Sequence, residues 1–228
     1  DSALYCLDPA TGKTRWRAER DEKTSWNTPL VVEHNGTTQV ILNGTNRVRS
    51  YDLKTGKQIW AVGGMTINAI PSPVAADGIV YVVSGYTGAG GVAISLDSTG
   101  DLGLDGPTLW RINKGTPYVP SPLLVGNRLY FTSANMPLYT VLDTKTGKTL
   151  LDRERLPGVN SFYASPIAAR GRIYLTDRAG TTLVLRQADK LEVLAMNVLD
   201  DPIDASPVAV DRQLFLRGER YLYCIEEK

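Results

Sequence analysis

The sequence predicts an all-β fold, a β-propeller built from four-stranded antiparallel blades, and three observations support this prediction. A hydroxyl residue followed by proline recurs at Pro29, Pro73, Pro122, Pro166 and Pro207, at intervals that indicate stacked supersecondary units. Each proline begins a short apolar run, which a turn signal separates from a strand rich in β-branched and aromatic residues. No segment combines the 3.6-residue apolar period of a helix with helix caps.

Each repeat contains the signals of four strands in the same order. The first strand follows the proline, and turns such as "HNG" and "ADG" join it to second strands such as "TTQVILNG" and "GIVYVVSG". The third strand ends in a motif such as "SYDLKTGK", and the fourth strand follows the Thr-Gly turn of that motif. Radial repetition of such units protects the strand edges, as in a propeller.

We predict a single domain that contains four full blades and two partial ones. The sequence begins and ends on a third strand, so we expect an arc of a seven- or eight-bladed ring. A closed five-bladed ring with a displaced N-terminal strand is the alternative. An arc exposes apolar blade faces, so we expect a dimer or association with a missing N-terminal half. The domain covers residues 1–228, with full blades over about 27–62, 71–113, 120–155 and 164–197 and partial blades over 1–18 and 205–228.

The motif between the third and fourth strands is predicted to be structural, because it recurs as "LDPATGKTRW", "YDLKTGKQIW" and "LDTKTGKTLL". Its Asp can accept hydrogen bonds from turn amides, and its Gly can adopt a positive φ without a Cβ clash. Its Trp is expected to cover the gap between neighbouring blades. The motif residues are Asp8, Gly12 and Trp16; Asp52, Gly56 and Trp60; Trp110; and Asp143 and Gly147, with Leu151 in the Trp position.

Composition argues against several classes of function. Twenty-five basic and twenty-four acidic residues give a net charge of +1, so we expect no nucleic-acid partner. No apolar run approaches the roughly 20 residues that span a bilayer, and the first residues lack the pattern of a secretory signal. Cys6 and Cys224 fit neither a disulfide scaffold nor a zinc site. His34 precedes Asn35-Gly36 and is expected to be an exposed turn residue.

The longest departure from the repeat spans residues 85–110 and carries Asp97, Asp101 and Asp105. Oxygen-rich loops can bind Ca²⁺, so these carboxylates are a candidate calcium site. Leu102 stands where an EF-hand loop requires glycine, and no bidentate Glu follows, which favours a flexible hairpin insertion.

The residues just before the repeated prolines are the candidate binding residues, because the connections between blades end around the central channel of a propeller. They mix aromatic, amide and acidic side chains, which suits a peptide or carbohydrate partner. The alternative is that several of them plug the channel. The candidates are Trp26, Asn27, Asn68, Tyr118, Phe162, Tyr163 and Asp204, joined by Arg20 in "RAERDEKTSW" and Arg47 in "NGTNRVR".

The motif resembles the repeat of the quinoprotein-like propellers, A-x-D-x-x-T-G-x-x-x-W, in "CLDPATGKTRW", "SYDLKTGKQIW" and, without the Trp, "VLDTKTGKTLL". The segments "DEKTSWNTPLV" and "IPSPVAADGIVYVVSGY" are similar to the C-terminal half of bacterial outer-membrane-assembly-like propeller proteins of planctomycete type. This resemblance to PQQ-like repeat propellers implies a periplasmic or extracellular location.

The function that this resemblance implies is a non-enzymatic exported scaffold or binding module with a protein partner and no cofactor. A PQQ-dependent dehydrogenase is the first alternative. It would bind PQQ and calcium, and it would require acidic and amide Ca²⁺ ligands, a catalytic Asp and, in many members, a disulfide between adjacent cysteines. This sequence has no adjacent cysteines. A propeller that binds carbohydrate or processes polysaccharide is the second alternative.

Overall fold

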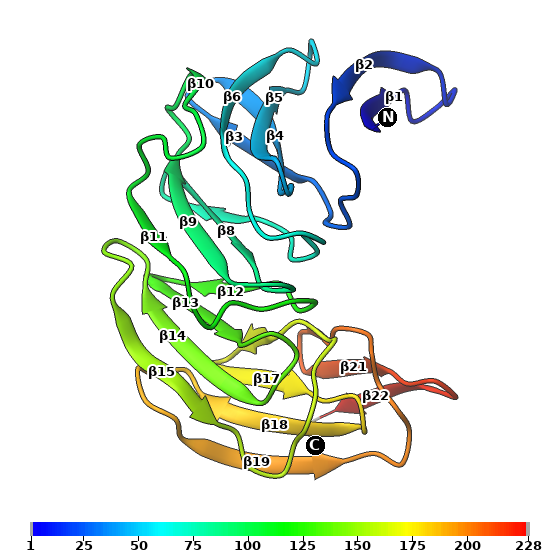
Figure 1. The fold of residues 1–228 in the computed structure, drawn as a ribbon. Helices are drawn as coiled ribbons and strands as arrows, with labels where there is room; N and C mark the ends of the chain where they lie inside the picture. Colours follow the sequence, from blue (N-terminus) through cyan, green and yellow to red (C-terminus); the bar gives the residue numbers. More distant parts are fainter. Residues whose placement is uncertain (1, 227–228) are drawn as a thin grey trace. The chain divides into compact units, whose positions relative to one another are not determined.

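The computed structural model describes residues 2–226, and all of the regular structure in this part of the chain is β-strand (Figure 1). Residues 1, 227 and 228, which the predicted partial blades include, lie outside the described residues. The chain forms two compact units, Asp1–Lys114 and Gly115–Lys228. No helix that could cross a membrane occurs between residues 2 and 226.

The first unit contains three sheets. The first is a hairpin of β1 (Ser2–Leu7) and β2 (Thr14–Arg20). The second is an antiparallel meander of β3 (Leu30–His34), β4 (Thr37–Leu42), β5 (Arg47–Asp52) and β6 (Gln58–Gly63). The third is a meander of β7 (Val74–Ala76), β8 (Ile79–Ser84), β9 (Gly90–Ser95) and β11 (Trp110–Ile112).

The second unit repeats the same pattern. Its first sheet contains β12 (Leu123–Val125), β13 (Arg128–Thr132), β14 (Leu138–Asp143) and β15 (Thr149–Arg155). Its second contains β16 (Ile167–Ala169), β17 (Arg172–Thr176), β18 (Thr181–Arg186) and β19 (Val193–Val198). Its third contains β20 (Val208–Val210), β21 (Gln213–Arg217) and β22 (Leu222–Glu226).

These sheets confirm the predicted fold class. Four sets of four antiparallel strands are complete, with β10 placed outside its own set, and the hairpin and the three-stranded sheet are partial sets. The number of blades in the intact ring stays a prediction, as does the single-domain organisation.

The expanded repeat differs from the flexible insertion that we expected. Gly100–Asp101 forms β10, which pairs in parallel with Trp60 and Ala61 of β6 and adds a fifth strand to that sheet. The amide of Leu102 donates a hydrogen bond of 2.8 Å to the carbonyl of Ala61. The insertion therefore covers the outer edge of another sheet. Local sequence did not reveal this placement because it depends on a tertiary contact.

His34 is also less exposed than we expected. It ends β3 before the turn Asn35-Gly36, whose φ values of 47° and 76° are those of a tight hairpin. The His34 side chain is only 19% exposed, and its Nε2 lies 2.8 Å from Oδ1 of Asp97. Contact with the expanded repeat therefore fixes the ring.

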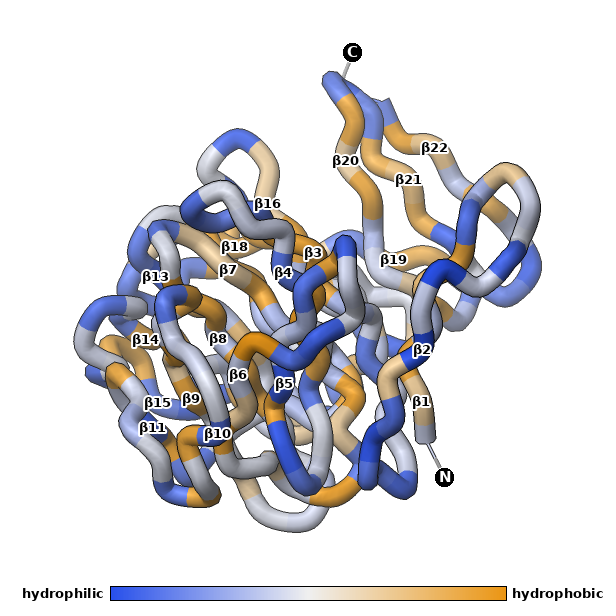
Figure 2. The backbone as a smooth tube through the Cα atoms, turned by 90° about the horizontal axis from the view of Figure 1, so that it is seen from above, coloured by the Kyte–Doolittle hydropathy of each residue, from blue (hydrophilic) through white to orange (hydrophobic). Residues whose placement is uncertain are grey.

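Apolar side chains between adjacent sheets form the core of each unit. In the first unit, Trp60 is fully buried with Ile41 and Val80 between the second and third sheets. In the second unit, Tyr130 and Leu183 belong to the cluster between the first two sheets. Figure 2 shows that β20 and β21 of the last sheet are also strongly hydrophobic.

The recurring motif forms the turn between the third and fourth strands. In each complete copy, Oδ1 of the Asp accepts hydrogen bonds from both the amide and the hydroxyl of a Thr three residues later. The side chain thus satisfies turn donors locally, as in an Asx turn. The pairs are Asp8 with Thr11, Asp52 with Thr55, and Asp143 with Thr146.

The first Trp of the motif packs on the glycine turn of the next sheet. The indole of Trp16 lies so close to Gly56 that a Cβ on Gly56 would stand 2.6 Å from Cδ2 of the ring. Nε1 of Trp16 donates a hydrogen bond of 2.8 Å to the carbonyl of Leu53 in the same turn. Gly56 has a φ of +72°, so both the backbone and the ring require glycine here.

Candidate functional site

Two kinds of connection meet at one edge of the sheets in each unit, and we call this edge the loop face. They are the loops that lead into a first strand and the turns between second and third strands. Hydrogen bonds join the two kinds: the amide of Arg178 donates to the carbonyl of Ser161, and the amide of Met65 donates to the carbonyl of Gly44. The loop face covers 21–29, 43–46, 64–73 and 85–89 in the first unit, and 115–122, 133–137, 156–166, 177–180, 199–207 and 218–221 in the second.

An aromatic ring, a cation and an acid meet on the loop face of the second unit. Nε and Nη2 of Arg178 donate to the two carboxylate oxygens of Asp204, at 2.6 and 3.0 Å. The guanidinium carbon lies 3.9 Å from the ring centroid of Tyr163, a cation–π contact. The hydrogen bonds to Asp204 raise the pKa of Arg178, which stays charged. The Arg178 and Asp204 side chains are about half exposed, so a ligand can reach this cluster.

The turn that carries Arg178 is held by the residue before it. The buried carboxylate of Asp177 accepts hydrogen bonds from the amides of Ala179 and Thr181, at 3.0 and 2.9 Å. Gly180 completes the turn with a φ of +93°. The backbone on both sides of Arg178 is therefore fixed before any partner binds.

The neighbouring turn is anchored in the same way by Asp201, which is 1% exposed. Its carboxylate accepts hydrogen bonds from the amides of Arg220 and Tyr221 and from the hydroxyl of Tyr223. Burial would raise the pKa of Asp201, but these hydrogen bonds outweigh that effect and lower the pKa. Asp201 is therefore an ionised structural anchor beside the loop that carries Asp204.

Phe162 does not lie on the surface where we expected it. It is fully buried in the cluster that contains Leu156 and Val159, which corrects its assignment to the binding face. Successive side chains of an extended segment point in opposite directions, so Phe162 enters the core while Tyr163 reaches the surface. Tyr118 is partly buried, and its amide donates to the carbonyl of Ala134.

On the loop face of the first unit, Trp26 is 66% exposed, and its amide donates to the carbonyl of Ala69. Asn27 instead has a structural role. Its Nδ2 donates to the carbonyl of Asn43 at 2.7 Å, and its Oδ1 accepts from the amide of the same residue. Asn68 is partly exposed, with a φ of +56°.

The charged run at residues 17–26 folds around a buried carboxylate. Glu22 is 3% exposed and accepts hydrogen bonds from the amide of Arg47 at 3.0 Å and from Nη1 of Arg49 at 2.7 Å. The guanidinium of Arg47 lies 3.8 Å from Asp101. Arg20 is partly buried, and its Nε and Nη2 find no hydrogen-bond partner among the described residues. Arg20 and Arg47, which we predicted as binding residues, are therefore partly packed against neighbouring residues and do not extend fully into solvent.

The three carboxylates of the candidate calcium site do not converge. Asp97 contacts His34, and Asp101 accepts a hydrogen bond of 2.8 Å from the amide of Gly103. Nowhere in residues 2–226 do three or more His, Cys, Asp or Glu side chains form a group that could hold a metal ion. This corrects the grouping of Asp97, Asp101 and Asp105 as one calcium site.

The structure adds loop-face residues that the sequence reasoning missed, all in turns between second and third strands. Besides Arg178, these turns expose Tyr86, Met136 and Tyr221 by 49–59%. These residues could have been found from their position in the repeat. The turns between second and third strands fall at the same point of successive repeats, as "NGTN", "GYTG", "SANM", "DRAG" and "GERY".

Comparisons with known proteins agree with the fold. Residues 1–102 match a family model described as outer membrane protein assembly factor BamB. BamB from Moraxella catarrhalis is 16% identical, with a TM-score of 0.50, over 97% of this chain and 75% of that one. The designed Ika8 protein is 13% identical, with a TM-score of 0.63, over 86% of this chain and 57% of that one. A europium-containing methanol dehydrogenase is 12% identical, with a TM-score of 0.59, over 86% of this chain and 47% of that one. No curated protein matches the sequence significantly.

At these identities, the likeness establishes the fold and leaves the chemistry to the residues of this chain. A Ca²⁺–PQQ site requires acidic and amide ligands, and no three or more His, Cys, Asp or Glu side chains group together in the described part of the chain. Cys6 and Cys224 are free thiols that are distant in sequence, so they cannot supply a disulfide between adjacent cysteines. The described residues therefore supply neither a cluster of acidic ligands nor the adjacent cysteines that many of those enzymes use.

Proposed function

We propose that this chain, which is a PQQ-like repeat β-propeller, is a non-enzymatic protein-interaction module that works outside the cytoplasm. The proposal rests on one observation, the recurrence of large exposed apolar side chains on the loop faces of both units. Their exposed fractions range from 49% to 66%, and they are Trp26, Ile67 and Tyr86 in the first unit and Met136 and Tyr221 in the second.

The composition of these surfaces favours a protein partner. Aromatic residues, Met and Arg are enriched at protein interfaces, and large rigid side chains supply most of the binding free energy there. In the second unit, the Tyr163–Arg178–Asp204 cluster adds a charged group whose orientation is already fixed by two hydrogen bonds. A preorganised surface loses less conformational entropy when a partner binds.

The matching family description supports both the location and the type of partner. It names an outer membrane protein assembly factor, which acts in the cell envelope. We extend to this chain a periplasmic or extracellular location and a protein partner. The partner itself is identified from the cross-linked adducts that photo-cross-linking in cells would give.

Site-specific photo-cross-linking in cells tests this function. A photoreactive phenylalanine analogue is placed at Trp26 or Met136 on the loop faces. Matched controls carry it at Lys54 or Lys145, which are exposed in motif turns at the opposite edge of the same sheets. We expect discrete adducts with an envelope protein from the loop-face positions only. The absence of adducts, or identical adducts from both edges, contradicts the proposal.

Reconstitution with PQQ and Ca²⁺ tests the alternative class. The described residues group no three metal ligands, so we expect neither stoichiometric PQQ binding nor turnover of alcohols or aldoses with an artificial electron acceptor. Stoichiometric binding with turnover would replace the scaffold function with that of a dehydrogenase.

A further inference from the structure

The Trp position of the repeated motif fills the space between adjacent sheets wherever the residue is large. Trp16 covers Gly56, and Trp60 is fully buried between the second and third sheets of the first unit. In the second unit, Leu151 takes this position and packs against the cluster between the first two sheets.

The next repeat places an alanine at this position. In β14–β15, Val141 pairs with Leu151, and in β18–β19, Val184 pairs with Ala195. The register thus makes Ala195 the counterpart of Leu151 and of the earlier tryptophans. The side chain that closes the space in the other repeats is absent here.

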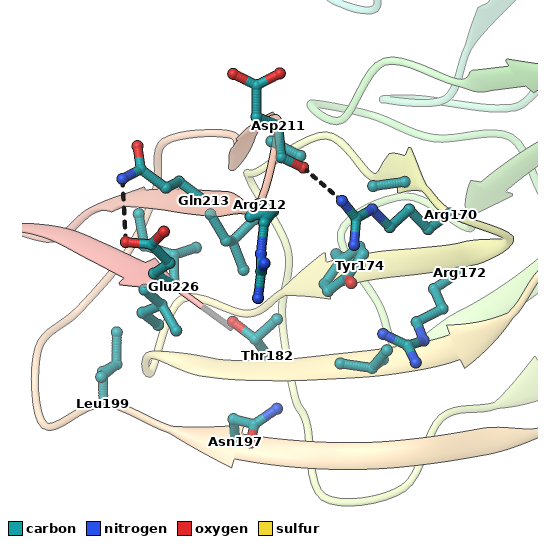
Figure 3. Close-up of a pocket in the computed structure, with 16 residues that line it drawn as sticks. Arg170, Arg172, Tyr174, Thr182, Asn197, Leu199, Asp211, Arg212, Gln213 and Glu226 are labelled. Carbon is teal, nitrogen blue, oxygen red and sulfur yellow. Dashed lines mark hydrogen bonds between the residues drawn. The ribbon is translucent and has the colours of Figure 1, made fainter. Parts of the chain in front are cut away.

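A cavity of about 350 Å³ lies next to this position, between the sheets β16–β19 and β20–β22 (Figure 3). Ala195 itself is exposed and does not line the cavity. Val184, the partner of Ala195, lines it, as does Asn197, which lies on the same face of β19 two residues further on. The cavity has the size of a small-molecule site, and Ala195, on the same face of β19 as Asn197, has no side chain large enough to reach into it.

The cavity combines apolar walls with a cationic rim. Leu214, Leu216 and Ile225 line it from the last sheet. Figure 3 shows the side chains of Arg172 and Arg212 directed toward Thr182 in this view, with Tyr174 between them. These arginines belong to the hairpins between first and second strands, at the edge of the sheets opposite the loop face.

The charges at the rim favour an anion. In Figure 3, the Asp211 carboxylate points away from the cavity, and Glu226 lies at the other end from Arg172, next to Gln213. The Arg172 guanidinium has no hydrogen bond or ion pair with any residue in the described part of the chain, while its backbone pairs within the sheet. An apolar space with an available guanidinium at its rim suits a ligand that has an apolar body and one anionic group.

We propose that this cavity binds a planar aromatic carboxylate about as large as a Trp side chain. The ring takes the place that Trp60 occupies in an earlier repeat, and the carboxylate accepts hydrogen bonds from Arg172 and Arg212. Arg172 and Arg212 lie at the edge opposite the loop face, so binding of this ligand can be tested separately from the proposed interaction function.

Calorimetric titration of the full chain with indole-3-acetate and with neutral indole tests the site. We expect saturable binding of indole-3-acetate that is about tenfold or more tighter than binding of indole, because a charged hydrogen bond is lost with the carboxylate. Ala195→Trp places a ring in the cavity and should abolish binding of both compounds while raising Tm by roughly 2–4 °C. Ala195→Leu, which copies Leu151, should weaken binding without disturbing the fold.

The charge requirement is tested by a matched pair of variants. Arg172→Gln should weaken indole-3-acetate binding about tenfold and leave indole binding unchanged. Arg155→Gln, an exposed position on β15 of the same unit, should change neither. The proposal is overturned if the wild-type chain shows no saturable binding or if binding survives Ala195→Trp. Equal losses in the two arginine variants also overturn it.

Discussion

At the residue scale, Trp60 and Trp26 show that burial decides what the same side chain does. Trp60 is fully buried, and its Nε1 donates to Oε1 of Gln39 at 3.1 Å, whereas Trp26 is 66% exposed on the loop face. Trp60→Ala should lower the free energy of unfolding by about 3–5 kcal/mol, because it leaves a large cavity. Trp26→Ala should change it by no more than about 0.5 kcal/mol. Denaturant unfolding measures both, and equal effects contradict the assigned roles.

The motif carboxylates make stability depend on acidic pH. Hydrogen bonding to Thr55 lowers the pKa of Asp52 below its ordinary 3.8, and hydrogen bonding to Thr146 does the same for Asp143. A lowered pKa adds stability above the ordinary value, and this contribution is lost as the pH falls through the folded-state pKa. Tm should therefore fall below about pH 4, and less steeply in Asp52→Asn than in the wild type. Thermal unfolding between about pH 5 and 2 measures this, and identical slopes count against the role of Asp52.

At the scale of the element, two glycines of the same motif provide a matched comparison. Gly12 and Gly56 have similar φ values, +69° and +72°, but only Gly56 lies against the ring of Trp16. Gly12→Ala should destabilise by about 1–2 kcal/mol through its backbone alone. Gly56→Ala should cost roughly 1–3 kcal/mol more, because its Cβ meets the indole. Chemical unfolding of both variants gives the difference, and equal losses would show that Trp16 does not constrain the turn.

The repeated strands were predictable because their signals are local. Prolines, turn dipeptides and alternating apolar residues mark each strand without reference to the rest of the chain. β10 and the partly buried ring of His34 were not predictable, since both depend on contacts between the expanded repeat and the preceding sheet. Tertiary contacts of this kind leave no periodic pattern.

The candidate site was predictable only in part for the same reason. Tyr163 and Asp204 precede the repeated prolines and were identified by position, but Phe162 beside them points into the core. Arg178 was missed because it lies in the turn between a second and a third strand. That turn is brought beside Asp204, in the loop before the next first strand, only by the antiparallel order of the strands. The cluster emerges from topology rather than from any one segment.

At the scale of the whole molecule, the last sheet leaves an apolar face uncovered. Ala209 and Leu214 line the cavity, so Val208 lies on the opposite face, where it is 54% exposed. Leu222 is 68% exposed at the edge of the same sheet. Figure 2 shows the hydrophobic character of β20. Large exposed apolar patches promote association.

We therefore expect the chain to self-associate as its concentration rises. The double variant Val208→Lys with Leu222→Lys should weaken this association, because it places charges on the uncovered sheet. Val31→Lys, at an exposed position on β3, serves as the control. Sedimentation velocity over a concentration series measures the change, and a monomeric wild-type chain, or equal effects of both variants, refutes this expectation.

The central claim is that the repeated motif stabilises the fold and that the loop faces bind the partner. It is tested most directly by measuring the cross-linking yield and Tm of the same variants. With the photoreactive residue at Met136, Arg178→Ala should lower the yield at nearly unchanged Tm, because an exposed ion pair contributes about 0–1 kcal/mol. Trp60→Ala should lower Tm and keep the yield at temperatures where the variant is folded. An unchanged yield in Arg178→Ala, or a yield lost in Trp60→Ala at unchanged Tm, would contradict this division of roles.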